Sequence, residues 1–170
     1  IFGEGIAILT GDALLTQAIE IAIQAKGWAC YSHADLIREI TTAAGSLKLI
    51  AGQVADLEAA GKNLTLPQLR YIHERKTNAL LTCSVRLGGM SANCTANQLK
   101  ALTTFGNHVG LAFQIIDDIL DVTKTTKQLG KTAGKDLRAS KATYPAIVGI
   151  KKSREIAEEL TDKSFAALKL

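Results

Sequence analysis

The stretch FQIIDDILDV, residues 113–122, places three aspartates in the middle of an apolar segment. Nine of the fourteen residues from 109 to 122 are apolar, as in a buried helix, and none of the fourteen is Lys or Arg. An ionised carboxylate is almost never fully buried without a partner, because removing it from water is costly. Asp117, Asp118 and Asp121 therefore need positive charge from outside their own helix.

Helix geometry puts the three carboxylates on one arc. At about 100° per residue, Asp121 and Asp118 lie about 40° and about 100° around the axis from Asp117, with Gln114 between them at about 60°. Crowded oxygen ligands favour a hard divalent ion such as Mg²⁺, which commonly bridges carboxylates to phosphates. The same D-D-x-x-D pattern also occurs by chance on solvated helix faces. The apolar surroundings favour the metal site.

Positive charge follows directly after the aspartates. Residues 124–141 carry a local charge of +5 in a chain of net charge +4, so the other residues sum to −1. The basic residues of this segment are Lys124, Lys127, Lys131, Lys135, Arg138 and Lys141. Nucleic-acid binding normally needs a broad positive face, which this distribution excludes. Two glycines and three threonines make a continuous helix improbable here, and we predict a mobile, phosphate-binding loop over a rigid bundle.

The rest of the sequence favours an all-α protein with a single domain over residues 1–170. Apolar residues make up 47% of the 170, only two are proline, and apolar positions recur at three and four residues. We expect helices over residues 5–26, 35–57, 65–87, 95–122, 144–152 and 154–168. Thr65 is the expected N-cap of the third helix and the pair Gly88-Gly89 its end. Gly106 and Gly110 are candidate bends or breaks in the fourth.

The first helix and the cysteines bear on the compartment. The run from residue 5 to 25 is apolar, but Asp12, Gln17 and Glu20 interrupt it, so we expect a buried helix and no stable membrane insertion. Three cysteines without a C-x-x-C pair indicate free or buried thiols in a reducing compartment. These features favour the cytoplasm. A plastid remains open, because the natural N-terminus is not in view.

Two further polar patches are weak signals when taken alone. Gln53 and Asp56 are three residues apart and so share a helix face, as surface pairs often do. Lys76 and Thr77, in HERKTNALL, precede an apolar run, and a lysine in that position is more often a surface residue than a ligand.

In combination, these motifs resemble one family. GQVADL, HERKTNALL, GLAFQIIDDILDV, LGKTAGKD and KATYPA, in this order, resemble the trans-isoprenyl diphosphate synthases, and most of all the short-chain farnesyl and geranylgeranyl diphosphate synthases. The opening FGEGIAILTGDALL is similar to the segment that follows the family's first aspartate-rich motif. The resemblance implies an all-α helical bundle around a central cavity and a homodimer. It also implies a prenyltransferase that joins isopentenyl diphosphate to an allylic diphosphate.

The resemblance also implies roles for individual residues. Asp117, Asp118 and Asp121 would be the second aspartate-rich motif and bind Mg²⁺ at the allylic diphosphate. Catalytic roles at that substrate fall to Lys76, Thr77, Gln114 and Lys131. Substrate-binding roles extend to Gln53, Asp56, Lys135 and Lys141, with Gln53 and Asp56 near the metal.

One departure from the family limits these expectations. The first D-D-x-x-D motif should lie just before Ile1, and the family usually continues beyond Leu170. We therefore expect a portion of a synthase that lacks the facing half of its metal site and is inactive alone. Two alternatives are a non-catalytic partner subunit of a prenyl synthase and a class I terpene cyclase. The intact DDILD disfavours the first, and the lack of a downstream motif rich in Asn, Ser and Glu disfavours the second.

Overall fold

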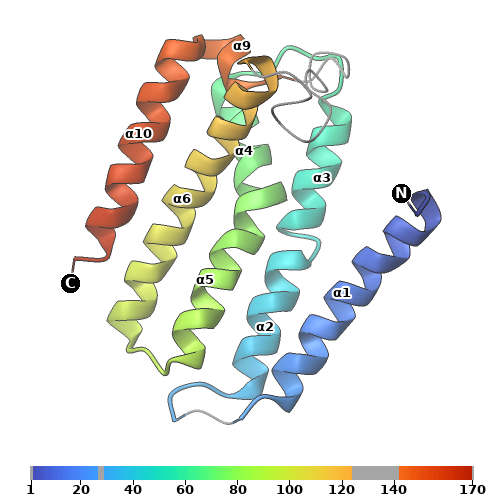
Figure 1. The fold of residues 1–170 in the computed structure, drawn as a ribbon, viewed down its shortest axis with the longest axis vertical. Helices are drawn as coiled ribbons and strands as arrows, with labels where there is room; N and C mark the ends of the chain where they lie inside the picture. The colour runs from blue at the N-terminus through green and yellow to red at the C-terminus, as the bar shows by residue number, and fades with distance from the viewer. Residues whose placement is uncertain (1, 27–28, 124–141, 170) are drawn as a thin grey trace.

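The computed structural model describes residues 2–26, 29–123 and 142–169, and every regular element within these ranges is helical (Figure 1). The elements are α1 (Glu4–Gln24), α2 (His33–Ala44), α3 (Leu49–Glu58), α4 (Leu66–His73), the π-helix η1 (Glu74–Asn78), α5 (Ala79–Ser91), α6 (Ala96–Thr123), α9 (Tyr144–Val148) and α10 (Ile150–Ala167). The predicted all-α class is confirmed.

Long helices lie side by side in one layer (Figure 1). From one edge to the other the order is α10, α6, the rod formed by α4, η1 and α5, then α2 with α3, and finally α1. The rod is continuous because η1 joins α4 directly to α5 without a turn. This order places the aspartate-bearing α6 next to the segment that contains Lys76.

Two predicted helix boundaries are wrong, and both involve glycine: one helix ends at Gly45, and another continues through Gly88 and Gly89. The helix predicted over residues 35–57 is broken into α2 and α3, and Gly45 caps the end of α2. A Cβ at Gly45 would lie 2.5 Å from the carbonyl oxygen of Thr41, so only glycine fits there. The pair Gly88-Gly89, by contrast, does not end a helix. It lies inside α5, where Gly89 accommodates Leu102 of α6.

The remaining boundaries are close to the predicted ones. Thr65 caps α4 in a capping box with Gln68, as predicted. Helix α6 runs unbroken through Gly106 and Gly110. The last two helices separate at Gly149, whose φ of 81° lies in the left-handed region, and not at residue 153. The predicted phosphate-binding loop falls in residues 124–141, outside the described residues.

Two separate apolar clusters form the core. One joins α1, α2 and α5 through Ala22, Leu36, Ile40, Ala43, Cys83 and Met90. The other joins α4, α6, α9 and α10 through Leu69, Leu111, Ile115, Ile119, Tyr144 and Ala157.

The three cysteines are free thiols, as predicted, and burial raises the pKa of the Cys83 thiol to about 11.

Helix α1 corrects a prediction, since we expected it to be buried. Ala22 is its only buried residue, and large apolar side chains such as Ile8 and Leu9 are 67% and 62% exposed. Because α1 is apolar on all sides, packing on α2 along one side leaves the rest uncovered. By length and composition alone, α1 is the one helix in the described ranges that could cross a membrane.

Candidate active site

The three aspartates do not face the same way on α6. Asp118 is 2% exposed and Asp121 is 6% exposed, whereas Asp117 is half-buried. The Asp118 side chain points into the apolar cluster between α4, α9 and α10, where it meets His73 and Tyr144. Asp117 and Asp118 are separated by about 100° around α6, and Asp121 lies between them.

Three donors surround the Asp118 carboxylate. Its Oδ2 lies 3.1 Å from Nε2 of His73 and accepts a 2.9 Å hydrogen bond from the backbone N–H of Tyr144. Its Oδ1 lies 3.4 Å from the amide nitrogen of Gln114. The His73 and Tyr144 rings stack, with centroids 5.7 Å apart. Burial raises the pKa of the Tyr144 phenol above its ordinary value.

Lys76 and Thr77 lie in η1, the π-helical turn between α4 and α5 within the rod. Such turns are rare and occur frequently at functional sites, because the extra residue rotates the side chains on either side. The ammonium of Lys76 donates a 2.6 Å hydrogen bond to the carboxylate of Asp56 on α3. Lys76 is about one third exposed and Asp56 is mostly buried. The pair joins α3 to η1 while the lysine stays accessible to a ligand.

Glycines let two helices approach η1 closely. A Cβ at Gly52 of α3 would lie 2.3 Å from the backbone nitrogen of Lys76. A Cβ at Gly110 of α6 would lie 2.0 Å from the side-chain oxygen of Asn78. Neither distance is sterically possible, so glycine at both positions is what allows α3 and α6 to flank the wide turn. The position of Lys76 is fixed from two sides.

A polar seam, formed by Asn78, Thr82 and Asn107, joins the rod to α6 on the C-terminal side of η1. The amide nitrogen of Asn78 donates to the carbonyl of Asn107, and the Thr82 hydroxyl lies 2.9 Å from the Asn78 side-chain oxygen. The same hydroxyl is 3.1 Å from the side-chain oxygen of Asn107. These groups satisfy one another where α5 and α6 are too close for larger apolar side chains.

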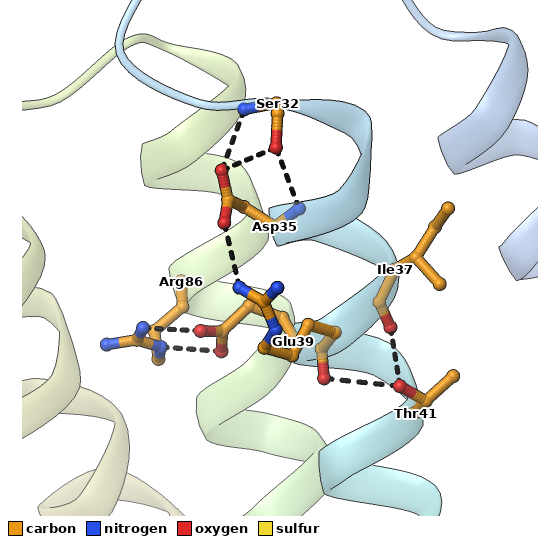
Figure 2. A network of polar contacts seen from close by, with 7 residues as sticks. Ser32, Asp35, Ile37, Glu39, Thr41 and Arg86 are labelled. Atoms are coloured by element: carbon orange, nitrogen blue, oxygen red, sulfur yellow. Dashed lines mark hydrogen bonds and ion pairs between the residues drawn. The ribbon is translucent and has the colours of Figure 1, made fainter.

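An ion pair joins α2 to α5 (Figure 2), and a hydrogen bond from the same arginine reaches α6. The Arg86 guanidinium of α5 makes a two-pronged contact with the Glu39 carboxylate of α2, at 2.7 and 2.5 Å. Arg86 also donates a 2.6 Å hydrogen bond to the Thr103 hydroxyl of α6. The hydrogen bonds to Glu39 raise the pKa of Arg86 above its ordinary value. Both charged side chains are about one quarter exposed.

Sequence reasoning identified part of this arrangement. Gln114 reaches Asp118, and Asp56 reaches Lys76, although the latter contact was not foreseen. Gln53 lies half-buried on α3, three residues before Asp56. Lys131, Lys135 and Lys141 lie outside the described residues. His73 was missed, and its place three residues before Lys76, in the quoted HERKTNALL, is the signal that could have found it.

The donor chemistry of the site fits a hard cation, but the described residues do not complete one. Within residues 2–26, 29–123 and 142–169, no group of three or more His, Cys, Asp or Glu side chains is placed to hold a metal ion. Asp117 and Asp121 still offer carboxylate oxygens about 40° apart on α6, which is the donor type that Mg²⁺ prefers. The assignment of the three aspartates as metal ligands therefore stays a prediction.

An apolar groove of about 590 Å³ lies between α1, α2 and α5. Its walls are almost entirely aliphatic and include Leu14, Ile21, Leu36, Leu80 and Leu87. Leu80 follows Lys76 by one turn of the rod, so the groove starts close to the lysine. This volume is typical of pockets that bind small molecules, and the lining suits a hydrocarbon.

Comparisons with known proteins agree with this geometry. The chain is 48% identical over 162 residues to the chloroplastic geranylgeranyl pyrophosphate synthase of Catharanthus roseus, a match that covers 94% of the chain and 45% of the relative. It is 46% identical over 166 residues to the chloroplastic heterodimeric geranylgeranyl pyrophosphate synthase large subunit 1 of Arabidopsis thaliana, covering 94% and 45% respectively. The chain thus spans about half the length of these relatives.

A solved structure and a family model extend the match to almost every residue. The crystal structure of a Helicobacter pylori geranyltransferase, complexed with magnesium and isoprenyl diphosphate, superposes with a TM-score of 0.83 at 31% identity. That superposition covers 98% of this chain and 54% of the other. The family model described as polyprenyl synthetase matches residues 1–168. The chain belongs to the polyprenyl synthetase family.

Proposed function

We propose that this protein supplies part of the active site of a prenyltransferase that condenses isopentenyl diphosphate with an allylic diphosphate to make farnesyl or geranylgeranyl diphosphate. The observation that carries the proposal is the placement of Lys76 in a π-helical turn, clamped between the α3 glycine and the aspartate helix and held by Asp56. The adjoining apolar groove suits the isoprenoid tail.

The residues present suit the charge changes of this reaction. The C–O bond of the allylic diphosphate breaks, and the electron pair leaves with pyrophosphate. Lys76 and Thr77 would bind that departing anion, and stabilising it lowers a barrier that consists largely of charge separation. The double bond of isopentenyl diphosphate then forms the new C–C bond, and pyrophosphate takes the proton that is lost. Aliphatic walls such as Leu80 keep water from the cation.

Magnesium would be held on the α6 face by Asp117 and Asp121. When bound, the ion would act as a Lewis acid that neutralises charge on the diphosphate oxygens. Gln114 and Asp56 lie on the neighbouring surfaces and would orient the substrate. Support comes from the oxygen-only donor set and from the magnesium bound by the H. pylori geranyltransferase.

The partner and the compartment are part of the proposal. The exposed apolar sides of α1 favour a homodimer over a monomer, as the family resemblance implies. The chloroplast named for the plant relatives favours a plastid over the cytoplasm.

The test is product formation by the chain after its N-terminus is joined to the part of the Catharanthus roseus synthase that precedes the matched residues. We expect Mg²⁺-dependent conversion of isopentenyl and dimethylallyl diphosphates into a product of about three or four isoprene units. In this chimera, Asp117→Ala should lower turnover at least ~100-fold while the helical circular dichroism signal is retained.

Asp162→Ala provides the matched control, because Asp162 is an exposed carboxylate on α10 and has no predicted role in the site. It should turn over like the parent. A chimera that ionises allylic diphosphate only to cyclic hydrocarbons would support the cyclase alternative. One that is inactive but stimulates a second synthase would support the partner-subunit alternative. Parent-like turnover by Asp117→Ala would refute the role of Asp117.

A further inference from the structure

One oxygen of the Asp118 carboxylate, Oδ2, has no capacity left for a metal ion, and the other, Oδ1, lies 3.4 Å from the amide nitrogen of Gln114. A carboxylate oxygen carries two lone pairs, and Oδ2 of Asp118 already accepts from His73 and from the Tyr144 backbone. The Asp118 side chain is 3% exposed and that of His73 is 9% exposed. A cation at Oδ2 would have to displace one of these two donors inside a packed apolar cluster.

The partners of Asp118 belong to elements that define the site. His73 is the last residue of α4 and immediately precedes η1. Tyr144 is the first residue of α9, and its N–H is one of the donors that a helix start leaves without an intrahelical acceptor. Asp118 therefore links α6, the end of α4 that precedes η1, and α9 through one side chain.

We propose that Asp118 is a positioning residue and not a metal ligand: by holding His73 and Tyr144, it sets the register of η1 and hence the position of Lys76 and Thr77 against α6. The metal-facing role within the D-D-x-x-D motif belongs to Asp117 and Asp121. Asp118 acts on the diphosphate only through the segment that it orients. The catalytic consequence of this inference rests on the proposed function. The role of Asp118 in holding His73 and Tyr144 does not.

The first test uses the 170-residue chain without metal. Asp118→Ala removes the acceptor of two buried hydrogen bonds and should lower the folding equilibrium constant at least ~10-fold, read from urea unfolding. A residue whose only task is to bind metal would give the opposite result, since removing an uncompensated buried carboxylate stabilises an apo protein. Asp117→Ala is the matched control and should change stability much less.

The second readout distinguishes positioning from stability alone. In the ¹⁵N NMR spectrum of the chain, Asp118→Ala should shift the backbone amide signals of Lys76 and Thr77 and abolish the slowly exchanging Nε2–H signal of His73. Asp118→Asn keeps an oxygen acceptor and should restore both in large part. His73→Phe keeps a stacked ring, removes the donor and should reproduce the Lys76 and Thr77 shifts. Asp117→Asn should leave them in place.

The third readout is the metal requirement of the chimera. Asp118→Ala should reduce kcat and leave the Mg²⁺ concentration at half-maximal rate within ~3-fold of the parent, whereas Asp117→Asn should raise that concentration at least ~10-fold. An increase for Asp118→Ala as large as that for Asp117→Asn would overturn the proposal. So would unmoved Lys76 and Thr77 signals in Asp118→Ala. A parent chimera without activity would refute the proposed function, while the two metal-free readouts would still decide the role of Asp118.

Discussion

At the scale of single residues, the absence of a side chain at Gly52 determines where Lys76 can lie. The backbone of η1 occupies the space that a Cβ at position 52 would need. Any larger residue would therefore push α3 away from η1 and stretch the hydrogen bond between Asp56 and Lys76. The position is demanding because the obstructing atoms are backbone atoms, which cannot rotate away as side chains can.

We expect Gly52→Ala to lower the free energy of unfolding by about 1–3 kcal/mol, the usual cost of overpacking a close contact. Gly88→Ala is the matched control, because Gly88 lies inside α5 with nothing within 4 Å of an added Cβ. It should raise stability by about 0.5–1 kcal/mol through helix propensity. Urea denaturation of both variants measures the difference. Equal effects of the two substitutions would contradict the close approach at Gly52.

Features that depend on neighbouring residues within one helix could be predicted from the sequence, whereas contacts between distant residues could not. The arc of Asp117, Asp118 and Asp121 comes from helix periodicity and could be predicted, as could the Thr65 cap. The pairing of the buried Asp118 carboxylate could not be predicted. It depends on His73, which lies 45 residues from Asp118 along the chain. A long-range donor of this kind leaves no periodic signal near the residue that it contacts.

At the scale of elements, the Glu39–Arg86 pair fixes α2 against α5 and, through Thr103, against α6. The two parallel hydrogen bonds and partial burial should make this pair stronger than a surface ion pair. Helix existence was predictable from apolar periodicity, but the break at Gly45 and the π-helical turn were not. The break at Gly45 depends on the carbonyl of Thr41 in the preceding turn, and η1 depends on the close approach of α3 and α6.

A double-mutant cycle of Glu39→Gln and Arg86→Met measures the strength of this pair. Each single variant should lower the free energy of unfolding by about 1–3 kcal/mol, with a coupling energy of about 0.5–3 kcal/mol between them. The surface pair Glu159–Lys163 on α10 is the control and should show a much smaller coupling, since water screens both groups. Additive effects at Glu39 and Arg86 would mean that the pair does not tie the helices together.

At the scale of the whole molecule, α1 is the element for which the predicted burial was wrong. Its composition predicted burial, yet most of its surface is uncovered within the described chain. Composition reports how much apolar surface needs covering. It does not report whether the cover comes from the same chain.

If a second copy covers α1, the chain should sediment as a dimer in analytical ultracentrifugation. Leu9→Glu should then weaken dimerisation at least ~10-fold, because it removes apolar area from the interface and adds a charge. Leu47→Glu is the control, since Leu47 is 80% exposed in the connection between α2 and α3. A monomeric parent chain, or the same response from both variants, would contradict the homodimer.

The polar seam of Asn78, Thr82 and Asn107 separates the two apolar clusters of the core. If each cluster forms a cooperative unit, each can open without the other. The boundary between these units crosses the rod beside the turn that carries Lys76. A ligand that bridges Lys76 and the aspartates of α6 would therefore couple the two units, and its binding energy would appear as increased cooperativity of unfolding as well as increased stability.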